Sequence, residues 1–253
     1  TLILHIGGDL IEMEPGGVLG PFLEAPPTVR GVVEMLRKAK TDSRISSVIL
    51  KPTGAGALWG KVQEVRDAIA DFRRSRKPIV AFLEYGGEQE FYLATACDKV
   101  FLMPSASLDL TGVANYELFL RGTLDKIGAF PDALHIGEYK TALNTFTEHT
   151  YTPAHREMAV SLNTDLYEQL VRGIADGRHK SETEVKSLID HGPFLSEDAL
   201  RAGLIDDVAY EDELDDKVQL AKGTVRFLEE KEYRKVSASS LGLNRGQRIA
   251  VIY

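Results

Sequence analysis

The sequence predicts an α/β protein with a mainly parallel sheet and a small α-rich C-terminal lobe. Short apolar runs alternate along the chain with longer amphipathic stretches, which is the pattern of βαβ units. The chain has 253 residues, enough for one large α/β domain with a full core. Its hydrophobic fraction of 43% is ordinary for a soluble globular protein.

The first part of the chain supplies most of the expected sheet. The expected strands are the short apolar runs at Thr1–Ile6, Ser46–Leu50, Pro78–Leu83, Lys99–Leu102 and Ala133–Ile136. The expected helices are the amphipathic stretches at Val29–Lys40, Lys61–Arg74, Glu88–Cys97, Glu117–Ile127 and Pro153–Asp176. Crossovers between parallel strands of one sheet are expected to be right-handed.

The later part of the chain predicts the small lobe, at about residues 177–222. A long helix begins after Thr152, with Pro153 in its first turn and Gly177 as the expected stop. Ser181–Glu184 has the form of a capping box before a further helix, and one strand is expected near Leu204–Ala209. Met13–Pro27 is rich in Gly and Pro and is expected to be a loop.

Composition excludes several classes of function. The formal net charge is −8 and no basic stripe is present, which argues against nucleic acid as a partner. No apolar run approaches the roughly 20 residues that span a bilayer. Cys97 is the single cysteine, so no internal disulfide can form, and its apolar helical context favours a core residue over a nucleophile.

Lys140 is the candidate catalytic residue. It follows the apolar run Ala133–Ile136 and a glycine-containing turn, so it is expected just beyond a strand tip and ahead of the helix at Pro153. A lysine that is shielded from water loses its proton more readily and can serve a serine as general base. The alternative is an exposed lysine on a loop.

Three other patterns have simpler structural explanations. Gly54 and Gly56 lie between a strand and a helix, but the spacing to Lys61 does not fit a phosphate-binding loop, and a tight turn is favoured. The acidic cluster of Glu84, Glu88 and Glu90 could act as acid and base or hold a metal, although a solvated loop is favoured. His149 and His155 lack the spacing of a helical zinc pair. We predict no metal and no cofactor.

Several segments, taken in order, resemble the signal peptide peptidase A (protease IV) family of membrane-associated Ser-Lys peptidases. They are Phe91–Val100, Gly137–Ala142, Thr152–Glu157, Gly177–Ser181 and Ala199–Asp206. The resemblance implies repeated βα units of the crotonase/Clp-protease kind. It also implies that Lys140 is the general base and that Gly54 and Gly56 match the place, though not the full pattern, of the family's oxyanion-hole turn.

The chain departs from this family where the nucleophile is expected. The family's Ser-Gly-Gly-Tyr-Tyr pattern corresponds here to Glu88–Tyr92, so that Glu88 holds the serine position and cannot accept an acyl group as serine does. In the long branch of the family, the N-terminal copy supplies the lysine and the C-terminal copy the serine. We therefore expect an N-terminal copy at residues 1–236.

Residues 237–253 are then expected to be a linker followed by the first strand of a second copy, at Arg248–Tyr253. A C-terminal edge strand of this domain's own sheet is the alternative for that strand.

The resemblance also implies partners and a location. The expected partners are the C-terminal copy with its serine, further copies in a homo-oligomer, and peptide substrates such as signal peptides. A membrane-associated, extracytoplasmic location is expected through an N-terminal anchor that this sequence lacks, with the chain itself soluble. Two alternatives remain: a non-catalytic scaffold copy, and an acyl-CoA enzyme of the crotonase type that uses the acidic cluster.

Overall fold

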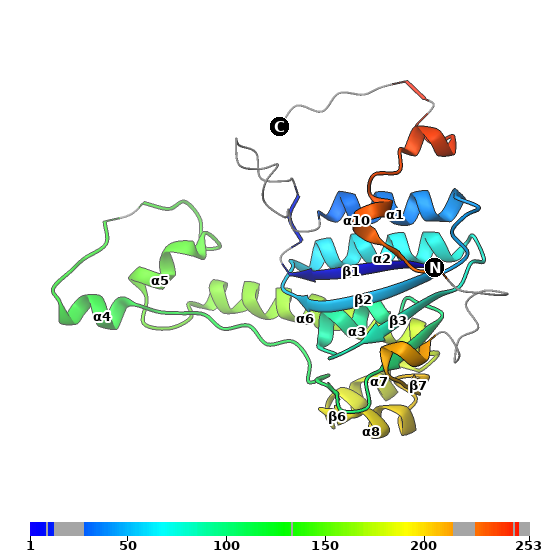
Figure 1. The fold of residues 1–253 in the computed structure, drawn as a ribbon. Helices are drawn as coiled ribbons and strands as arrows, with labels where there is room; N and C mark the ends of the chain where they lie inside the picture. Colours follow the sequence, from blue (N-terminus) through cyan, green and yellow to red (C-terminus); the bar gives the residue numbers. More distant parts are fainter. Residues whose placement is uncertain (9, 13–27, 133, 215–225, 245, 248–253) are drawn as a thin grey trace. The chain divides into compact units, whose positions relative to one another are not determined.

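The computed structural model describes all residues except 9, 13–27, 133, 215–225, 245 and 248–253. Its main sheet is parallel, which confirms the predicted fold class, and has the strand order β7-β4-β3-β2-β1-β8 (Figure 1). The six strands are β1 Leu2–Gly8, β2 Val48–Ala55, β3 Ile79–Leu83, β4 Lys99–Leu102, β7 Asp207–Val208 and β8 Leu228–Glu229.

Contacts divide the chain into two compact units. Unit 1 comprises residues 1–111 and 172–253, and unit 2 comprises residues 112–171. The main sheet belongs to unit 1. The long helix α6, Pro153–Arg178, contributes residues to both units. The sequence patterns did not indicate this division.

Helices α1 and α2 pack against one another on one side of the sheet in unit 1 (Figure 1). Helix α3 packs against α2 and against strands β2 and β3. The hydroxyl group of Thr28 caps α1 by accepting a hydrogen bond from the amide of Gly31. Among the described residues, the helices of unit 1 besides part of α6 are α1 Val29–Thr41, α2 Trp59–Arg73, α3 Glu88–Ala94, α7 Glu182–Ile189, α8 Ser196–Arg201 and α10 Glu230–Tyr233.

The core lies on both faces of the central strands. All five residues of β3 are buried, as expected for a parallel strand that is covered on both sides. Four phenylalanines are almost fully buried, and each contributes about 2–3 kcal/mol through loss of apolar surface. They are Phe72, Phe82, Phe91 and Phe101.

The predicted C-terminal lobe is joined to this sheet. Strand β7, found where a strand was expected near Leu204–Ala209, pairs with β4. A separate antiparallel pair links β5, Ser107–Leu108, to β6, Phe194–Leu195. Ser181 caps α7 by accepting a hydrogen bond from the amide of Glu184, which confirms the helix start read from the capping sequence.

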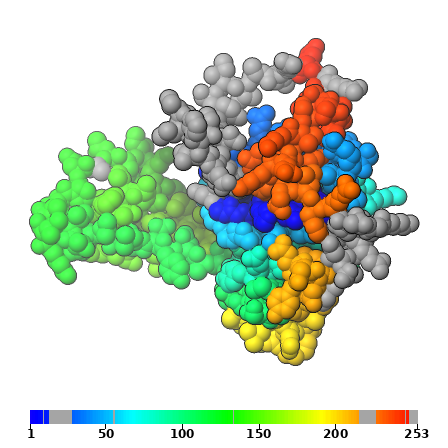
Figure 2. Space-filling model, viewed as in Figure 1, coloured from blue at the N-terminus to red at the C-terminus, as the bar shows by residue number. Residues whose placement is uncertain are grey.

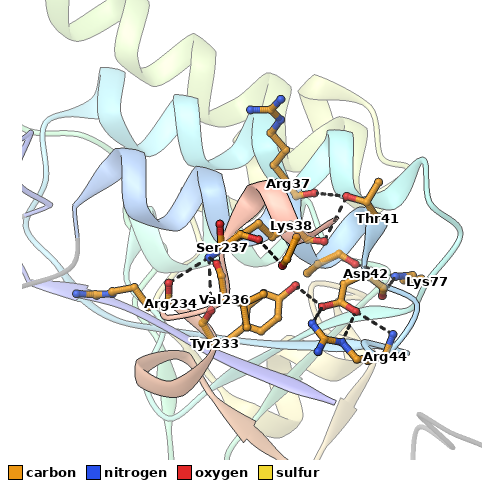
Figure 3. Close-up of polar contacts among 12 residues, drawn as sticks. Arg37, Lys38, Thr41, Asp42, Arg44, Lys77, Tyr233, Arg234, Val236 and Ser237 are labelled. Atoms are coloured by element: carbon orange, nitrogen blue, oxygen red, sulfur yellow. Dashed lines mark hydrogen bonds and ion pairs between the residues drawn. The ribbon is translucent and has the colours of Figure 1, made fainter. Parts of the chain in front are cut away.

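The segment after β8 is attached to α1 through Lys38 (Figure 3). The Lys38 side chain is 3% exposed, and its ammonium group donates to the carbonyl oxygens of Tyr233, Arg234 and Val236 at 3.4, 3.3 and 2.8 Å. Burial lowers the pKa of Lys38. The buried ammonium group thus caps the C-terminal end of α10.

Asp42, directly after α1, binds the same segment. Its carboxylate accepts from the Tyr233 hydroxyl at 3.3 Å and from Arg44 at 2.8 Å (Figure 3). The hydrogen bond from the Arg44 side chain lowers the pKa of Asp42 despite its burial. Burial and the nearby Asp42 carboxylate raise the pKa of Tyr233. The loop that follows α1 is therefore fixed to α10.

The strand expected at Ala133–Ile136 is wrong over its described residues. Leu134 to Ile136 have no strand conformation, and Leu134 and Ile136 are 99% and 92% exposed. A four-residue apolar run becomes a strand only where another strand supplies hydrogen-bond partners. Ala133 lies outside the described residues.

Several helix boundaries differ from the predictions: α1 ends at Thr41, α2 spans Trp59–Arg73 and α3 ends at Ala94. Two other boundaries also differ. The helix expected at Glu117–Ile127 is α4, Arg121–Lys126, because the amide of Leu120 donates to Thr145 at 2.6 Å instead of starting an earlier turn. Helix α6 continues past the expected stop at Gly177 to Arg178, and His179 then has a left-handed φ of 54°.

Two predictions fall outside the described residues: the loop at Met13–Pro27 and the strand at Arg248–Tyr253. The proposed boundary between residues 236 and 237 stays a prediction. Within the part of the chain that the structure describes, no helix combines the length and apolar character needed to cross a membrane.

Candidate active site

Lys140 lies in unit 2, directly before the short 3-10 helix η2, Thr141–Leu143. Its amide donates to the carbonyl of Gly137 at 3.3 Å, and Gly137 has a left-handed φ of 88° that favours glycine. The predicted glycine turn is therefore present, and the helix expected at Pro153 is α6, whereas η2 was not predicted. The predicted strand tip is not, because Lys140 follows an irregular segment.

Both chain neighbours of Lys140 are attached to α6. The hydroxyl of Tyr139 donates to the Glu157 carboxylate at 2.8 Å, and this hydrogen bond raises the pKa of Tyr139. The Thr141 side chain is buried and lies 3.8 Å from the sulfur of Met158. The backbone on each side of Lys140 is thus anchored to the same helix, while Lys140 itself is exposed.

Lys140 borders a shallow depression of about 570 Å³. Most of the side chains that line it are apolar, and Leu134, Ile136 and Tyr139 are exposed beside the lysine. The full lining is Leu134, His135, Ile136, Tyr139, Lys140, Thr141, Ala142 and Leu143. Because burial favours a neutral amine over an ammonium group, a surface that covered this depression would favour base chemistry there.

A buried polar group lies behind the turn. The amide nitrogen of Asn144, at the start of α5 (Asn144–Thr147), lies 3.4 Å from Nδ1 of His155 and 3.5 Å from Oγ1 of Thr152. Asn144 and His155 are 6% and 4% exposed. The sequence patterns indicated His155 only as a possible metal ligand and gave no indication of Asn144.

Glu88 lies in unit 1, at the start of α3 and shortly after β3. Its carboxylate oxygen accepts hydrogen bonds from the amide and the hydroxyl of Thr111 at 3.0 and 3.1 Å. A helix start after a parallel strand is a suitable place for a nucleophile. Here that place holds a carboxylate that binds a neighbouring loop.

The three glutamates of the predicted acidic cluster, Glu84, Glu88 and Glu90, have different environments. Glu84 and Glu211 bind the buried ammonium group of Lys51 at 3.0 and 2.8 Å. Burial acts to lower the pKa of Lys51, but the hydrogen bonds that its ammonium group donates to these two carboxylates outweigh this effect and raise that pKa. Glu90 is 5% exposed, unlike the other two. Over the described residues, no group of three or more His, Cys, Asp and Glu side chains could hold a metal ion.

The glycine turn at the end of β2 is a structural connection. Gly54 has a left-handed φ of 56°, and the amide of Gly56 donates to the carbonyl of Gly8 at 3.3 Å. An amide used in this way is not directed at an oxyanion, so the turn does not form an oxyanion hole through Gly56. Trp59, at the start of α2, packs edge-on against Tyr92, with the ring centroids 5.7 Å apart.

The remaining candidates have structural environments. Cys97 is buried, and burial raises the pKa of its thiol, which fits the predicted core role. The His149 ring lies 3.2 Å from Asp125. His155 instead contacts the rings of Phe119 and Tyr151, so the two histidines do not share partners.

The parallel sheet with its packed helices and small C-terminal lobe defines an α/β protein of the crotonase-like kind. The family model of peptidase family S49 matches residues 71–224, which is more than half of the chain. The chain therefore belongs to peptidase family S49.

Three relatives illustrate this membership. The chain is 33% identical over 221 residues to the chloroplastic serine protease SPPA of Arabidopsis thaliana, covering 85% of this chain and 33% of the relative. It is 26% identical to Protease 4 of Salmonella typhi, and the match covers 100% of this chain and 44% of the relative. It is 24% identical to a putative signal peptide peptidase SppA of Enterococcus faecium, and the match covers 71% of this chain and 52% of the relative. The chain thus spans a third to about half of the length of these relatives.

Proposed function

We propose that this chain is the lysine-bearing part of a serine endopeptidase that degrades signal peptides and other hydrophobic peptides. Lys140 is the general base, and the nucleophilic serine belongs to a C-terminal copy of the same protein. The observation that carries the proposal is the Lys140 turn, which is anchored on both sides of the lysine and opens into an apolar depression. The carboxylate of Glu88 at the serine position supports a nucleophile from elsewhere.

In this mechanism Lys140 accepts one proton and later donates it. Its neutral amine accepts the proton of the serine hydroxyl as the serine oxygen attacks the peptide carbonyl. The resulting ammonium group then donates that proton to the leaving amine when the peptide bond breaks. A covering surface keeps the amine neutral before attack, and the copy that carries the serine supplies it.

The exposed apolar surface of unit 2 supports such partners. Eleven of the seventeen large hydrophobic side chains that are exposed among the described residues belong to unit 2, the green part of Figure 2. Exposed apolar surface of this extent is typical of interaction sites. We assign it to the C-terminal copy and to neighbouring subunits of a homo-oligomer. The eleven are Tyr116, Leu118, Ile127, Phe130, Leu134, Ile136, Tyr139, Phe146, Met158, Val160 and Leu162.

The proposal includes a location and excludes some ligands. The protein that contains this chain is membrane-associated on the extracytoplasmic side, through an N-terminal anchor outside this sequence. It uses no cofactor, because a serine and a lysine suffice for peptide hydrolysis. Nucleic acid is not a partner of a chain with a formal net charge of −8.

The alternatives now differ in support. The acyl-CoA alternative depended on the acidic cluster, whose members have separate partners. A non-catalytic scaffold copy remains a second candidate because Lys140 is exposed in this chain.

The deciding experiment compares Lys140→Ala with Lys126→Ala in the full protein that contains this chain. Lys126 is an exposed lysine of the same unit and serves as the matched control. Hydrolysis of a fluorogenic apolar peptide is expected to fall about a thousandfold or more for Lys140→Ala and to stay unchanged for Lys126→Ala. The 253-residue chain alone is expected to be inactive and unlabelled by a fluorophosphonate. Normal turnover by Lys140→Ala would favour the scaffold alternative.

A further inference from the structure

The turn that bears Lys140 has one buried polar contact with α6, and it lies at Asn144. Asn144 closes the turn in three ways. Its backbone amide donates to the carbonyl of Thr141, and its backbone carbonyl accepts from the amide of Glu148 at 3.0 Å. Its side chain faces α6. The contacts of Tyr139 and Thr141 lie nearer the surface or involve a weak sulfur acceptor. Asn144 is therefore the residue whose displacement would move the whole turn.

The side-chain partners of Asn144 define its orientation. When the side-chain amide nitrogen of Asn144 donates to Nδ1 of His155, the neutral imidazole carries its proton on Nε2. Nε2 lies 3.9 Å from the Glu117 carboxylate. The rings of Phe119 and Tyr151 lie edge-on to the imidazole at 5.9 and 4.9 Å. This surrounding is largely apolar, so a buried amide or imidazole without its partner would be costly.

We propose that Asn144 and His155 are positioning residues that hold the Lys140 turn on the first turn of α6. The inference rests on the proposed function of Lys140 as general base. Neither residue touches the substrate; each acts through the backbone between Thr141 and Glu148. Because a misplacement of about 1 Å can reduce a catalysed rate about a hundredfold, fixing this backbone contributes to catalysis.

The first test measures hydrogen exchange in the 253-residue chain. The reporters are the amides of Lys140, Asn144 and Glu148, which have hydrogen bonds within the turn. Asn144→Ala is expected to speed their exchange about tenfold, the loss of one buried hydrogen bond. Asn115→Ala, which removes an exposed amide of the same unit, is expected to leave it unchanged.

The second test separates hydrogen bonding from packing at His155. His155→Asn keeps an acceptor near the position of Nδ1 but loses bulk, whereas His155→Leu keeps bulk and loses the acceptor. Exchange in the turn is expected to stay within about threefold of the parent for His155→Asn and to rise about tenfold for His155→Leu. The reverse order would mean that His155 only fills space, and it would overturn the inference. Circular dichroism verifies that each variant is folded.

The third test uses the full protein and separates this inference from the proposed function. Asn144→Ala is expected to lower kcat about 10- to 100-fold with little change in KM, because the base is displaced while peptide binding remains. Normal activity of Lys140→Ala would refute the general base but not the exchange result. Loss of activity in Lys140→Ala, together with unchanged exchange and kcat in Asn144→Ala, would refute the positioning role alone.

Discussion

Replacing Lys38 with methionine tests how the segment after β8 is held. Lys38→Met keeps an unbranched side chain of similar length but removes the donor to the carbonyls of Tyr233, Arg234 and Val236. Hydrogen bonds from a charged donor contribute about 1.5–3 kcal/mol, and the best of the three measures 2.8 Å. Relief from burying an ammonium group offsets part of this loss. We expect the free energy of unfolding to fall by about 1–2 kcal/mol.

Two further variants calibrate that value. Lys38→Ala also removes about three buried methylene groups, worth about 0.8 kcal/mol each, and is expected to cost about 2 kcal/mol more than Lys38→Met. Lys40→Met in the same helix removes a partly exposed ion pair with Asp71 at 2.7 Å and is expected to cost at most about 1 kcal/mol.

Urea unfolding of the 253-residue chain, followed by tryptophan fluorescence and circular dichroism, provides the changes in the free energy of unfolding for the three variants. Equal stabilities of Lys38→Met and the parent would refute the argument that the ammonium group holds α10. A cost for Lys40→Met as large as that for Lys38→Met would show that the effect is not specific to the buried contact.

Two other predictions concern stability. Because the pKa of Asp42 is lowered in the folded state, its contribution is present above the ordinary aspartate pKa of about 3.9 and is lost as pH falls through the folded value. Unfolding of Asp42→Asn at pH 3 to 6 should therefore depend less on pH than that of the parent, and an equal pH dependence would contradict the assignment to Arg44. Gly177→Ala places a Cβ 2.0 Å from the carbonyl oxygen of Thr95 and is expected to destabilise by about 1–3 kcal/mol. Gly60→Ala, whose Cβ meets nothing within 4 Å, should be neutral or slightly stabilising by thermal melting, and similar values for the two glycine variants would contradict the packing argument.

The central sheet was predictable because its strands are buried runs. Strand β3 was expected at Pro78–Leu83 and found at Ile79–Leu83, and β4 was found at its expected bounds. A strand that is covered on both faces has a near-continuous apolar sequence that is easily recognised. The two-residue strand β8 has no such pattern, since its conformation depends on pairing with β1.

The run at Ala133–Ile136 shows why apolar sequence alone was misleading. Exposed apolar residues in unit 2 have the same composition as a buried strand, and only their solvent exposure in the folded chain distinguishes them. The strand prediction at Ala133–Ile136 assumed that an apolar run lies in the core. A surface that another chain or copy covers contradicts that assumption.

The candidate site was predictable only at its motif. Lys140 was found through the Gly-Glu-Tyr-Lys-Thr-Ala segment, which the family resemblance carries. Asn144 and His155 were not found, because their pairing joins residues eleven positions apart in different helices. The segment Thr152–Glu157 contained one available signal, a histidine in the first turn of a predicted helix.

The pairing of β1 with β8 has a consequence for how this chain folds during synthesis. Leu2 pairs with Leu228, so one edge of the first strand stays uncovered until more than 220 further residues have been made. An uncovered strand edge can pair with other chains, and contacts between distant segments form slowly. If synthesis stalls before β8, the nascent chain therefore has an incomplete sheet whose open edge can pair with other chains. This nascent chain is expected to depend on chaperones until β8 has paired with β1.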